Sequence, residues 1–510
     1  MAIVEALTPT ADGHRRLGLR SPADGADVGE IVVRTPEEVT AAIAKARAAQ
    51  PGWAARPVSE RAAIIRQAVQ VLVNRRAEIA ATVRGETGKP LVEALAVEIL
   101  PSCDFLNYWS GRAPKDLADE KRRLHGYLAP LKKLVVGYRP LGVVGVITPW
   151  NGPFVLSINP VAQALLAGNA VLLKPSEVTP HSGEWAVRVL HEAGVPADVL
   201  QVLHGDGETG AALVDGDIDK ISFTGSVPTG KRIAAACAER LIPCTLELGG
   251  KDAMIVCADA DLERASAGAV YLSMFNSGQV CVGVERVYVV ESIAEEFIAK
   301  VREKAAAVTY GANKDVGPLF WDRQLDIVSK HVQDARDKGA TVLLGGEQDT
   351  ADGVYFQPTV VVDVTHDMEL MREETFGPIV SIMCVADEDE AVRRANDSAY
   401  GLSGSVFTRD REKAVRLARR LHTGSVVHND ASVIYGVPEA PFGGRKDSGL
   451  GQVNGIDALR GFTHAQPVLI DRWGPKKESI WYPYADQMVQ TLDRTIRLGF
   501  GSKLARRLMR

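Results

Sequence analysis

Two stretches decide the fold: VVGVITPWNGP at residues 143–153 and AVLLKPSE at residues 170–177. Each starts with a run of β-branched or apolar residues, which predicts a buried strand, and a helix-like stretch separates the two runs. The alternation continues, with strands expected at 143–148, 170–174, 200–203, 220–223 and 244–248, and helices at 160–167, 181–193 and 228–238. Alternating strands and helices form a parallel sheet, so the sequence predicts a doubly wound, dinucleotide-type α/β domain.

Flanking segments extend this domain on both sides. Apolar residues recur at helical spacing over 39–50 and 59–81, which predicts two amphipathic helices ahead of the sheet. A second α/β unit is expected to begin near Asp252. Its predicted elements are a strand at 286–290, helices at 293–308 and 324–338, and an exposed turn at 345–355.

The composition of the 510-residue chain is that of a globular protein, with 46% hydrophobic and 24% charged residues. A formal net charge of -5 gives no general field that would attract nucleic acid. The chain has no apolar run long enough to span a bilayer, and its first 22 residues lack a secretion signal. Six cysteines without C-x-x-C spacing predict neither disulfides nor a metal site, and favour a cytoplasmic location.

A carboxylate and a thiol give the best indication of chemistry. Glu247 opens the stretch ELGGK (247–251), and Cys281 follows in a small, apolar context, QVC (279–281). A thiol can attack a carbonyl and hold the product as a thioester, and a nearby carboxylate can activate the water that hydrolyses it. Taken alone, however, a cysteine in an apolar stretch is more often an inert buried side chain.

Four further motifs follow predicted strands or precede turns. Asn151 comes directly after a strand, where its amide could face a developing oxyanion, although Asn-Gly is also a turn signal. KPSE (174–177) offers a cation and a carboxylate where a doubly wound sheet binds a nucleotide, or is a solvated loop. FTGSVPTG (223–230) suits a pyrophosphate at a helix N-terminus, but lacks the G-x-G-x-x-G pattern. EETFGP (373–378) is also consistent with a helix-ending turn.

In this order, the motifs resemble those of the NAD(P)-dependent aldehyde dehydrogenase superfamily from about Arg34 to Gln466. The matching segments are 148–153, 174–177, 223–230, 247–251, 279–281, 374–378, 396–408 and 441–451. The resemblance implies an α/β, aldehyde dehydrogenase-like fold. The expected parts are a Rossmann-type NAD domain (1–120 and 141–249), a catalytic domain (250–446), small β oligomerisation strands (121–140 and 460–472) and a C-terminal tail (473–510).

The resemblance also implies roles for three catalytic residues. Cys281 attacks the aldehyde, and the oxyanion is held by the Asn151 side chain and the Cys281 main-chain N–H. After hydride transfer to the nicotinamide, Glu247 activates the water that releases a free carboxylic acid. Relatives that transfer the acyl group to coenzyme A generally lack this glutamate, so its presence favours hydrolysis.

For the cofactor, the resemblance implies that NAD is bound by residues from four motifs. Lys174 and Glu177 contact the adenosine ribose, Ser226 the pyrophosphate and Glu374 the nicotinamide ribose, while Phe376 lies beside the nicotinamide. The remaining expected cofactor residues are Thr148, Trp150, Gly225 and Gly230. A carboxylate at position 177 would repel a 2′-phosphate, so NAD is expected to be preferred over NADP.

The substrate is expected to be an apolar or aromatic aldehyde. Gly152 stands where many relatives have a bulky aromatic residue, and Asn159 stands where some semialdehyde-specific relatives have an arginine. Residues expected near the substrate tunnel are Val155, Leu156, Val280, Val282, Ile434 and Tyr435, several of which could equally be core residues. A succinate-semialdehyde dehydrogenase, a coenzyme A-acylating enzyme and a catalytically silent member are the alternatives.

The last two expectations concern the assembly of the protein and its C-terminal tail. Relatives form dimers or tetramers through a projecting hairpin, expected here at about 121–139 and pairing with residues after Phe462. The segment 494–510 has six basic residues, no acidic residue and interspersed apolar residues, as in a weak peripheral membrane contact. Packing on a neighbouring subunit or disorder are the alternatives, because Gly499 and Gly501 are expected to interrupt a helix.

Overall fold

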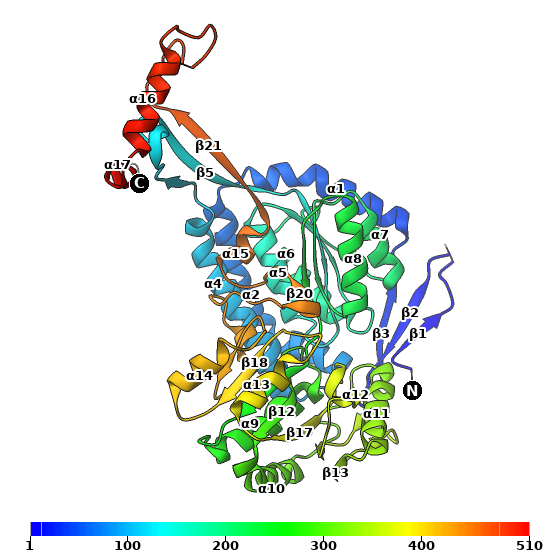
Figure 1. Cartoon of the computed structure of the whole chain (residues 1–510). Helices are drawn as coiled ribbons and strands as arrows, with labels where there is room; N and C mark the ends of the chain where they lie inside the picture. The colour runs from blue at the N-terminus through cyan, green and yellow to red at the C-terminus, as the bar shows by residue number, and fades with distance from the viewer. Residues whose placement is uncertain (1, 12, 479, 509–510) are drawn as a thin grey trace.

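Figure 1 shows the computed structural model of the chain, which describes residues 2–11, 13–478 and 480–508. The first unit is built on a six-stranded sheet in the order β20-β10-β9-β6-β7-β8. Its strands are β6 (Val143–Ile147), β7 (Ala170–Lys174), β8 (Leu200–Val202), β9 (Lys220–Thr224), β10 (Cys244–Glu247) and β20 (Gly449–Leu450). All pairs are parallel except β10 with β20. The strand order reverses between β6 and β9, where such sheets bind ligands.

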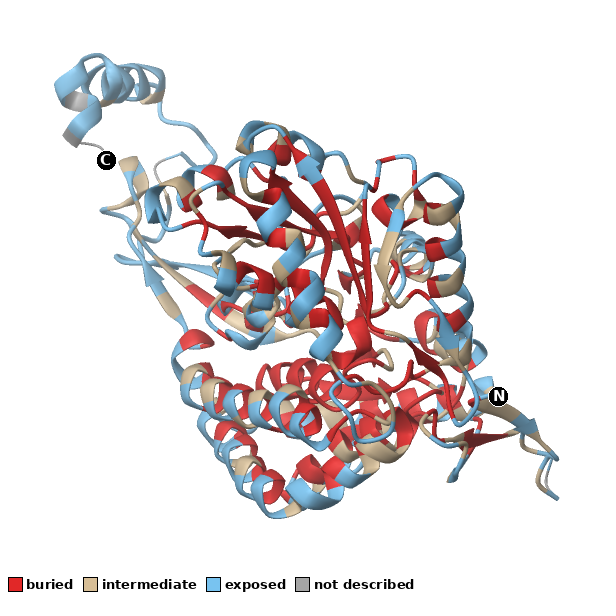
Figure 2. Ribbon diagram, turned by 90° about the horizontal axis from the view of Figure 1, so that it is seen from below, coloured by how far each residue is buried: buried red, intermediate tan, exposed pale blue. Residues whose placement is uncertain are grey.

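Helices cover both faces of this sheet. Side chains alternate along a strand. Val144 and Val146 therefore pack in one hydrophobic cluster with α2, α4, α5 and α6, whereas Val143 and Leu172 pack in another with α1, α7 and α8. The helices are α1 (Pro36–Ala54), α2 (Val58–Thr87), α4 (Leu100–Asp116), α5 (Val155–Leu166), α6 (Pro180–Glu192), α7 (Gly207–Asp215) and α8 (Val227–Glu239). Figure 2 shows the resulting buried strands between partly exposed helices.

The helix expected at 160–167 begins earlier than its sequence predicts. α5 starts at Val155 and carries Pro160 inside it. The carboxylate of Glu98 accepts hydrogen bonds from the N–H groups of Phe154 (3.1 Å) and Val155 (2.9 Å). The first N–H groups of a helix have no partner inside it. Glu98 accepts from two of them here, so the helix begins at Val155 although the neighbouring sequence does not predict a start there.

The second unit is a seven-stranded sheet in the order β13-β16-β17-β12-β11-β18-β19. Its strands are β11 (Asp252–Val256), β12 (Val284–Val290), β13 (Thr341–Leu344), β16 (Thr359–Val362), β17 (Ile379–Val385), β18 (Gly404–Phe407) and β19 (Val427–His428). One face packs against α9 (Leu262–Met274) and α10 (Glu291–Ala307). The other packs against α11 (Asp322–Asp337), α12 (Glu369–Arg372), α13 (Glu388–Asn396) and α14 (Arg411–Ala418).

Two small sheets and a hairpin lie outside these units. At the N-terminus, β1 (Val4–Leu7), β2 (Arg16–Arg20) and β3 (Asp27–Val32) form an antiparallel sheet. The exposed turn expected at 345–355 is wrong in part. β14 (Gln348–Asp349) pairs with β15 (Tyr355–Phe356), and Tyr355 is buried, with its hydroxyl donating to the main-chain oxygen of Ala23 at 2.9 Å.

A projecting flap carries the C-terminal tail. β4 (Glu120–Arg122), β5 (Lys132–Pro140) and β21 (Thr463–Asp471) form an antiparallel sheet in the order β21-β5-β4, with α15 (Ile456–Arg460) ahead of β21. The tail contains α16 (Met488–Phe500) and α17 (Lys503–Leu508), and Figure 1 shows both beyond the flap. Gly499 lies inside α16, contrary to the expectation, because a helical glycine costs only about 1 kcal/mol. Arg510 of the predicted basic segment lies outside the described residues.

No helix among the described residues combines the length and the apolar character needed to cross a bilayer.

Candidate active site

Cys281 follows a tight backbone turn between α9 and β12. The turn is η3 (Phe275–Gly278), in which Asn276 (φ 53°), Ser277 (φ 58°) and Gly278 (φ 73°) all have left-handed conformations. For residues with side chains such conformations cost about 1–3 kcal/mol each, so they persist only where surrounding contacts hold them.

Buried polar groups supply these contacts. The main-chain N–H of Asn276 donates to Glu93 Oε1 at 2.8 Å, and burial raises the pKa of Glu93 to about 7. The Gln279 side chain accepts from the N–H of Phe320 at 2.9 Å and donates to the oxygen of Asn276 at 3.1 Å. The segment before Cys281 is thereby fixed at both ends.

Asn151, which follows β6, reaches this turn from the first unit. Its Nδ2 donates to the main-chain oxygen of Gln279 at 3.0 Å, two residues before Cys281. Its own main-chain oxygen accepts from Asn276 Nδ2 at 3.1 Å and from Lys89 Nζ at 3.2 Å. The structure therefore brings the predicted amide donor beside the loop of the predicted nucleophile.

Lys89 and Glu98 are site residues that sequence reasoning missed. They form a fully buried ion pair, with 2.7 Å between Lys89 Nζ and Glu98 Oε1. Glu98 lies in the π-helix η1 (Ala94–Ile99), which follows α3 (Leu91–Glu93). A mid-helix π segment frequently marks a functional site. The only available signal was the sequence TGKP (87–90) before an acid-containing helix, which resembles a solvated surface.

Glu247 ends β10, and both of its carboxylate oxygens are buried without a hydrogen-bond partner among the described residues. Burial raises its pKa well above the usual range. Burial also raises the pKa of the Cys281 thiol, and the negative charge of Glu247 raises it further. The charge of one group thus acts on the other, which disfavours charging both together.

The ELGGK stretch passes so close to Cys281 that only glycine fits. A Cβ on Gly250 would lie 2.2 Å from the main-chain oxygen of Cys281. A Cβ on Gly249 would lie 2.4 Å from Glu374 Oε2, while the N–H of Gly250 donates to Glu374 Oε1 at 2.9 Å. Burial and the charge of Glu285 raise the pKa of Glu374 to about 8.

A buried ion pair orients the neighbouring aromatic residue. Lys251 Nζ is paired with Glu285 and donates to Thr375 Oγ1 at 3.0 Å. Glu285 accepts from the N–H groups of Thr375 (2.8 Å) and Phe376 (3.0 Å). This pairing supports the left-handed Phe376 backbone (φ 54°) and directs its ring edge-to-face against Trp150, with 5.5 Å between ring centroids.

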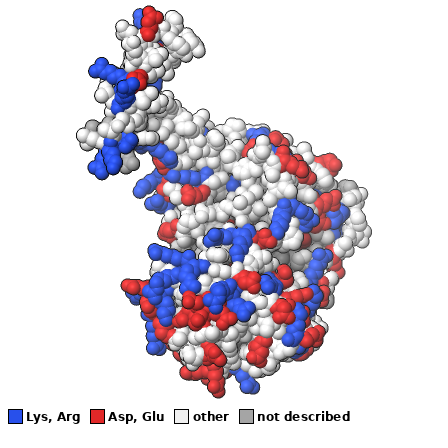
Figure 3. All heavy atoms as spheres, in the orientation of Figure 1, with Lys and Arg blue, Asp and Glu red and all other residues white. Residues whose placement is uncertain are grey.

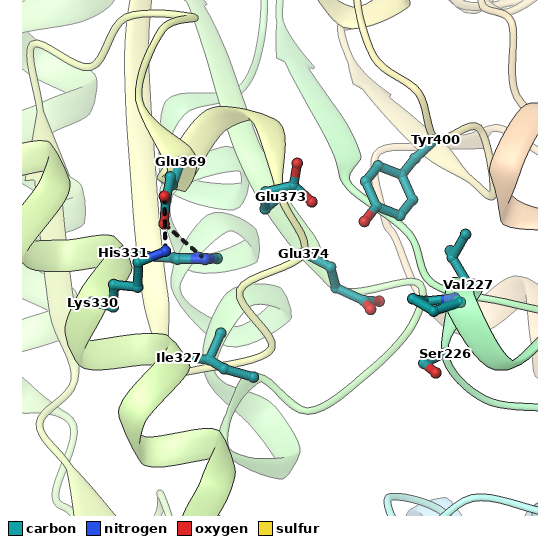
Figure 4. Close-up of a pocket in the computed structure, with 10 residues that line it drawn as sticks. Ser226, Val227, Ile327, Lys330, His331, Glu369, Glu373, Glu374 and Tyr400 are labelled. Atoms are coloured by element: carbon teal, nitrogen blue, oxygen red, sulfur yellow. Dashed lines mark hydrogen bonds and ion pairs between the residues drawn. The ribbon is translucent and has the colours of Figure 1, made fainter.

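A pocket of about 330 Å³ lies between the two units beside these residues (Figure 4). It is lined by Ser226, Val227, Pro228, Ile327, Lys330, His331, Glu369, Glu373, Glu374 and Tyr400. Ser226 stands at the N-terminal end of α8, so two predicted cofactor residues, Ser226 and Glu374, share this pocket. A helix N-terminus favours an anion such as a pyrophosphate.

The other predicted cofactor residues lie at the carboxyl ends of strands. Lys174 ends β7, and its Nζ is 3.0 Å from Glu177 Oε2, so the carboxylate is held in place by a cation. The hydroxyl of Thr148, directly after β6, is 2.9 Å from that of Ser157. Thr148 therefore braces the start of α5 in this structure.

Gly225 and Gly230 serve close packing around α8. The N–H of Gly225 donates to the main-chain oxygen of Glu247 at 2.9 Å. A Cβ on Gly230 would lie 2.4 Å from Leu248 Cδ2. Both glycines thus fix the helix against the strand that carries Glu247.

Cys281 packs against apolar side chains. Val282, Leu402 and Phe442 form a buried cluster, against which Cys281 and three more predicted tunnel residues pack: Val280, Ile434 and Tyr435. Tyr435 belongs to η4 (Val433–Gly436) and packs edge-to-face on Phe442.

The remaining predicted tunnel residues, Val155 and Leu156, belong to the core cluster of the first unit. A Cβ on Gly152 would lie 3.2 Å from Leu156 Cδ1 and 3.3 Å from Val155 Cγ1. Val155 and Leu156 therefore fill part of the space beside Gly152 that a larger side chain at position 152 would occupy.

Asn159 is fully engaged within the protein. Its Oδ1 accepts from Trp109 Nε1 (2.9 Å) and Gln163 Nε2 (3.0 Å). Its Nδ2 donates to Asn454 Oδ1 at 3.2 Å and to the Tyr435 hydroxyl at 3.4 Å. Its amide is therefore committed to contacts within the protein.

A cluster of one thiol and two carboxylates lies apart from the residues described above. Among the described residues, Cys257, Asp259 and Glu388 place possible metal-ligand atoms within 4.8 Å of one another. Lys413 Nζ already lies 2.9 Å from Asp259 and 3.2 Å from Glu388, so the carboxylates have a cationic partner.

Comparison with known proteins identifies relatives across nearly the whole chain. The aldehyde dehydrogenase family model matches residues 9–468. The chain is 41% identical over 470 residues to the 4,4'-diapolycopene aldehyde oxidase of Methylomonas sp, covering 91% of this chain and 88% of that protein. It is 42% identical over 455 residues to a Mycolicibacterium smegmatis protein provisionally named an NADP-dependent succinate-semialdehyde dehydrogenase. This match covers 88% of this chain and 87% of that protein.

Solved structures confirm the predicted fold class. The crystal structure of a Mycobacterium tuberculosis aldehyde dehydrogenase complexed with NAD+ is similar with a TM-score of 0.86 and 36% identity. The similarity covers 92% of this chain and 97% of that one.

Proposed function

The chain belongs to the aldehyde dehydrogenase family, and we propose that it oxidises an apolar or aromatic aldehyde to the free carboxylic acid with NAD. The observation that carries this proposal is the buried carboxylate of Glu247, which has no hydrogen-bond partner among the described residues and whose charge raises the pKa of the Cys281 thiol. Such a pair provides a nucleophile and a base with no competing hydrogen bond.

In the first step, Cys281 Sγ bonds to the aldehyde carbon, the carbonyl π bond opens to an oxyanion, and the proton of the partly exposed thiol passes to solvent. The developing oxyanion accepts hydrogen bonds from Asn151 Nδ2 and from the Cys281 N–H. Contact of Asn151 with the Gln279 oxygen supports this role, because it holds the amide beside the nucleophile loop. Removing one such donor typically costs about 100-fold to 1,000-fold in rate.

In the second step, the acyl group leaves as an acid. NAD held by Lys174, Glu177, Ser226 and Glu374 would supply the acceptor for the hydride of the substrate carbon. The remaining thioester is attacked by a water whose proton passes to Glu247, and the S–C bond then breaks. Since Glu247 has no hydrogen-bond partner within the described part of the chain, its oxygens are free to orient that water.

The residues around the pocket fit the cofactor. Ser226 at the N-terminus of α8 suits the pyrophosphate, and Glu374 suits a ribose hydroxyl pair. Lys174 and Glu177 would hold the adenosine ribose, and Phe376 and Trp150 would border the nicotinamide. The fixed carboxylate of Glu177 supports a preference for NAD over NADP.

The apolar surroundings of Cys281 support the substrate class. Valine, leucine and phenylalanine side chains gather beside the thiol, and Asn159 is engaged with protein groups rather than free for a distant carboxylate. A succinate-semialdehyde activity, the alternative favoured by the names of several relatives, is the second candidate. Coenzyme A acylation and catalytic silence are both disfavoured by the presence of Glu247 with Cys281.

A panel of aldehydes tests the proposal by following NADH formation. Medium-chain and aromatic aldehydes should give higher kcat/KM than short acidic semialdehydes, and Cys281→Ala should remove turnover. Equal or higher efficiency on succinate semialdehyde would overturn the substrate class, and no turnover with any aldehyde would overturn the activity.

We also propose a homodimer or homotetramer that functions in the cytoplasm. The outer strand β21 has no partner on its second side among the described residues, and its residues from His464 onward are exposed, which supports pairing with a second copy. Six free cysteines support a reducing compartment. Light scattering after size exclusion tests the assembly, and a monomeric mass would contradict it.

A further inference from the structure

The helix α16 presents an apolar face that nothing in the described chain covers. Val489, Leu492, Ile496 and Phe500 follow one another at spacings of three and four, so they share one side of the helix. All four are exposed, Val489 to 78% and Ile496 to 60%. A contiguous exposed apolar face of this kind marks an interaction surface.

We propose that the C-terminal tail docks this face of α16 on the surface of an anionic lipid bilayer. Arg494 lies on the opposite side of the helix. Arg497 lies on its flank, 2.9 Å from Asp493, and α17 adds Lys503, Arg506 and Arg507. Residues 486–508 contain these five cations and two acids, Asp486 and Asp493, which gives a net charge of +3, against -5 for the whole chain. An apolar face bordered by cations lies in the interface plane of an anionic membrane.

Aromatic side chains before α16 add to this surface. Trp473, Trp481, Tyr482 and Tyr484 are all more than half exposed. Tryptophan and tyrosine favour the level of the lipid headgroups because their rings are apolar and their polar atoms remain hydrated. The tail thus combines an apolar helix face, cations and exposed aromatic side chains, which together are typical of a segment that binds at a membrane surface.

The base of the tail is fixed to the flap, although α16 itself stands apart. Trp473 Nε1 donates to the oxygen of Pro130 at 2.9 Å, and Lys132 Nζ pairs with Glu478 at 2.8 Å. The main contacts of α16 with another element are those with α17. Figure 3 shows the basic side chains of this region at the end of an arm that extends from the body.

The charge of the tail favours lipid over a second copy of the tail. Two tails packed face to face would bring their net positive charges together, whereas anionic headgroups would neutralise them. Each Lys or Arg near such a surface adds to the electrostatic attraction, which salt weakens. Burial of the apolar face contributes a further part of the binding free energy that does not depend on salt.

Co-sedimentation of the full chain with vesicles tests this surface. The chain should bind vesicles of mixed phosphatidylcholine and phosphatidylglycerol, bind less at high salt, and not bind pure phosphatidylcholine. The double variant Leu492→Glu/Ile496→Glu should lower the affinity by at least about tenfold, since it places charge on the apolar face. Leu498→Glu is the matched control, because Leu498 is 66% exposed on the opposite side of α16.

Three outcomes would overturn the inference. These are no binding of the full chain to anionic vesicles, equal loss of binding in the Leu498→Glu control, or a double variant that binds as well as the unaltered chain. If the full chain does not bind vesicles and the double variant has a lower oligomeric mass than the unaltered chain, the face is a contact between copies. Because binding is measured without substrate, and turnover of a soluble aldehyde should be the same in both variants, the result is independent of the proposed activity.

Discussion

The ammonium of Lys89 lies 3.2 Å from the main-chain oxygen of Asn151, in a site that also buries the Glu98 carboxylate completely. The contact joins a residue near the end of α2 to the proposed oxyanion donor, 62 positions later in the chain. Glu98 in turn accepts the first N–H groups of α5. One buried ion pair therefore sets the backbone on both sides of the segment from Asn151 to Val155.

Lys89→Met should destabilise the protein and impair catalysis. It leaves Glu98 buried without its cation, which typically costs about 3–5 kcal/mol, so the unfolding midpoint should fall by several degrees. Thermal unfolding measures this change. The exposed Lys45 in α1 provides a control, since Lys45→Met should change stability by less than about 0.5 kcal/mol. Partial recovery in Lys89→Met/Glu98→Gln should follow, and its absence would contradict the unpaired-charge explanation.

Alkylation of Cys281 should be slow at neutral pH and rise well beyond the pH at which ordinary thiols react. Burial, followed by the charges of Glu247 and Glu374, raises the pKa of this thiol, so the reactive thiolate is scarce in the free protein. Glu247→Gln removes one of these charges and should shift the rate profile to lower pH. Iodoacetamide rates read by peptide mass spectrometry give both curves, with the exposed Cys384 as internal reference. Superimposable profiles would show that Glu247 does not act on the thiol.

The same Glu247→Gln variant should separate the two halves of the reaction. Acylation needs Cys281 and Asn151, so a first burst of NADH should remain. Hydrolysis loses its base, and steady turnover should fall by about 100-fold to 10,000-fold. Rapid-mixing measurement of NADH distinguishes the phases. An unchanged steady rate would remove Glu247 from the mechanism.

Gly250→Ala should disrupt the site without removing any functional group. Its Cβ would meet the main-chain oxygen of Cys281 at 2.2 Å, and a backbone atom cannot move aside cheaply, so we expect kcat/KM to fall at least about 100-fold. Gly210→Ala, inside α7 with no atom within 4 Å of the new Cβ, should keep full activity and gain up to about 1 kcal/mol of stability. Full activity in both variants would contradict the close approach.

Local sequence patterns predicted the parallel sheets well, and long-range polar contacts poorly. The strand at 170–174 coincides with β7 because five apolar or amphipathic residues buried on both faces leave little ambiguity. The start of α5 was missed because its N–H groups are satisfied by Glu98, more than 50 residues away. Cys281, Glu247 and Asn151 were all selected from motifs. Lys89 and Glu98 were not, since a buried charge pair and a solvated one have the same residue types.

Glu177→Ser should relax the choice between NAD and NADP. The carboxylate of Glu177 is held by Lys174 at 3.0 Å and would repel a 2′-phosphate, whereas a serine at this position removes the charge and leaves Lys174 free to attract it. We expect the ratio of kcat/KM for NAD to that for NADP to fall by at least about tenfold, mainly through a lower KM for NADP. Glu192→Ser, an exposed acid at the end of α6, is the control and should leave the ratio unchanged. Since this ratio is measured with one aldehyde, it is independent of the substrate class. An unaltered ratio in Glu177→Ser would place the cofactor discrimination on other residues.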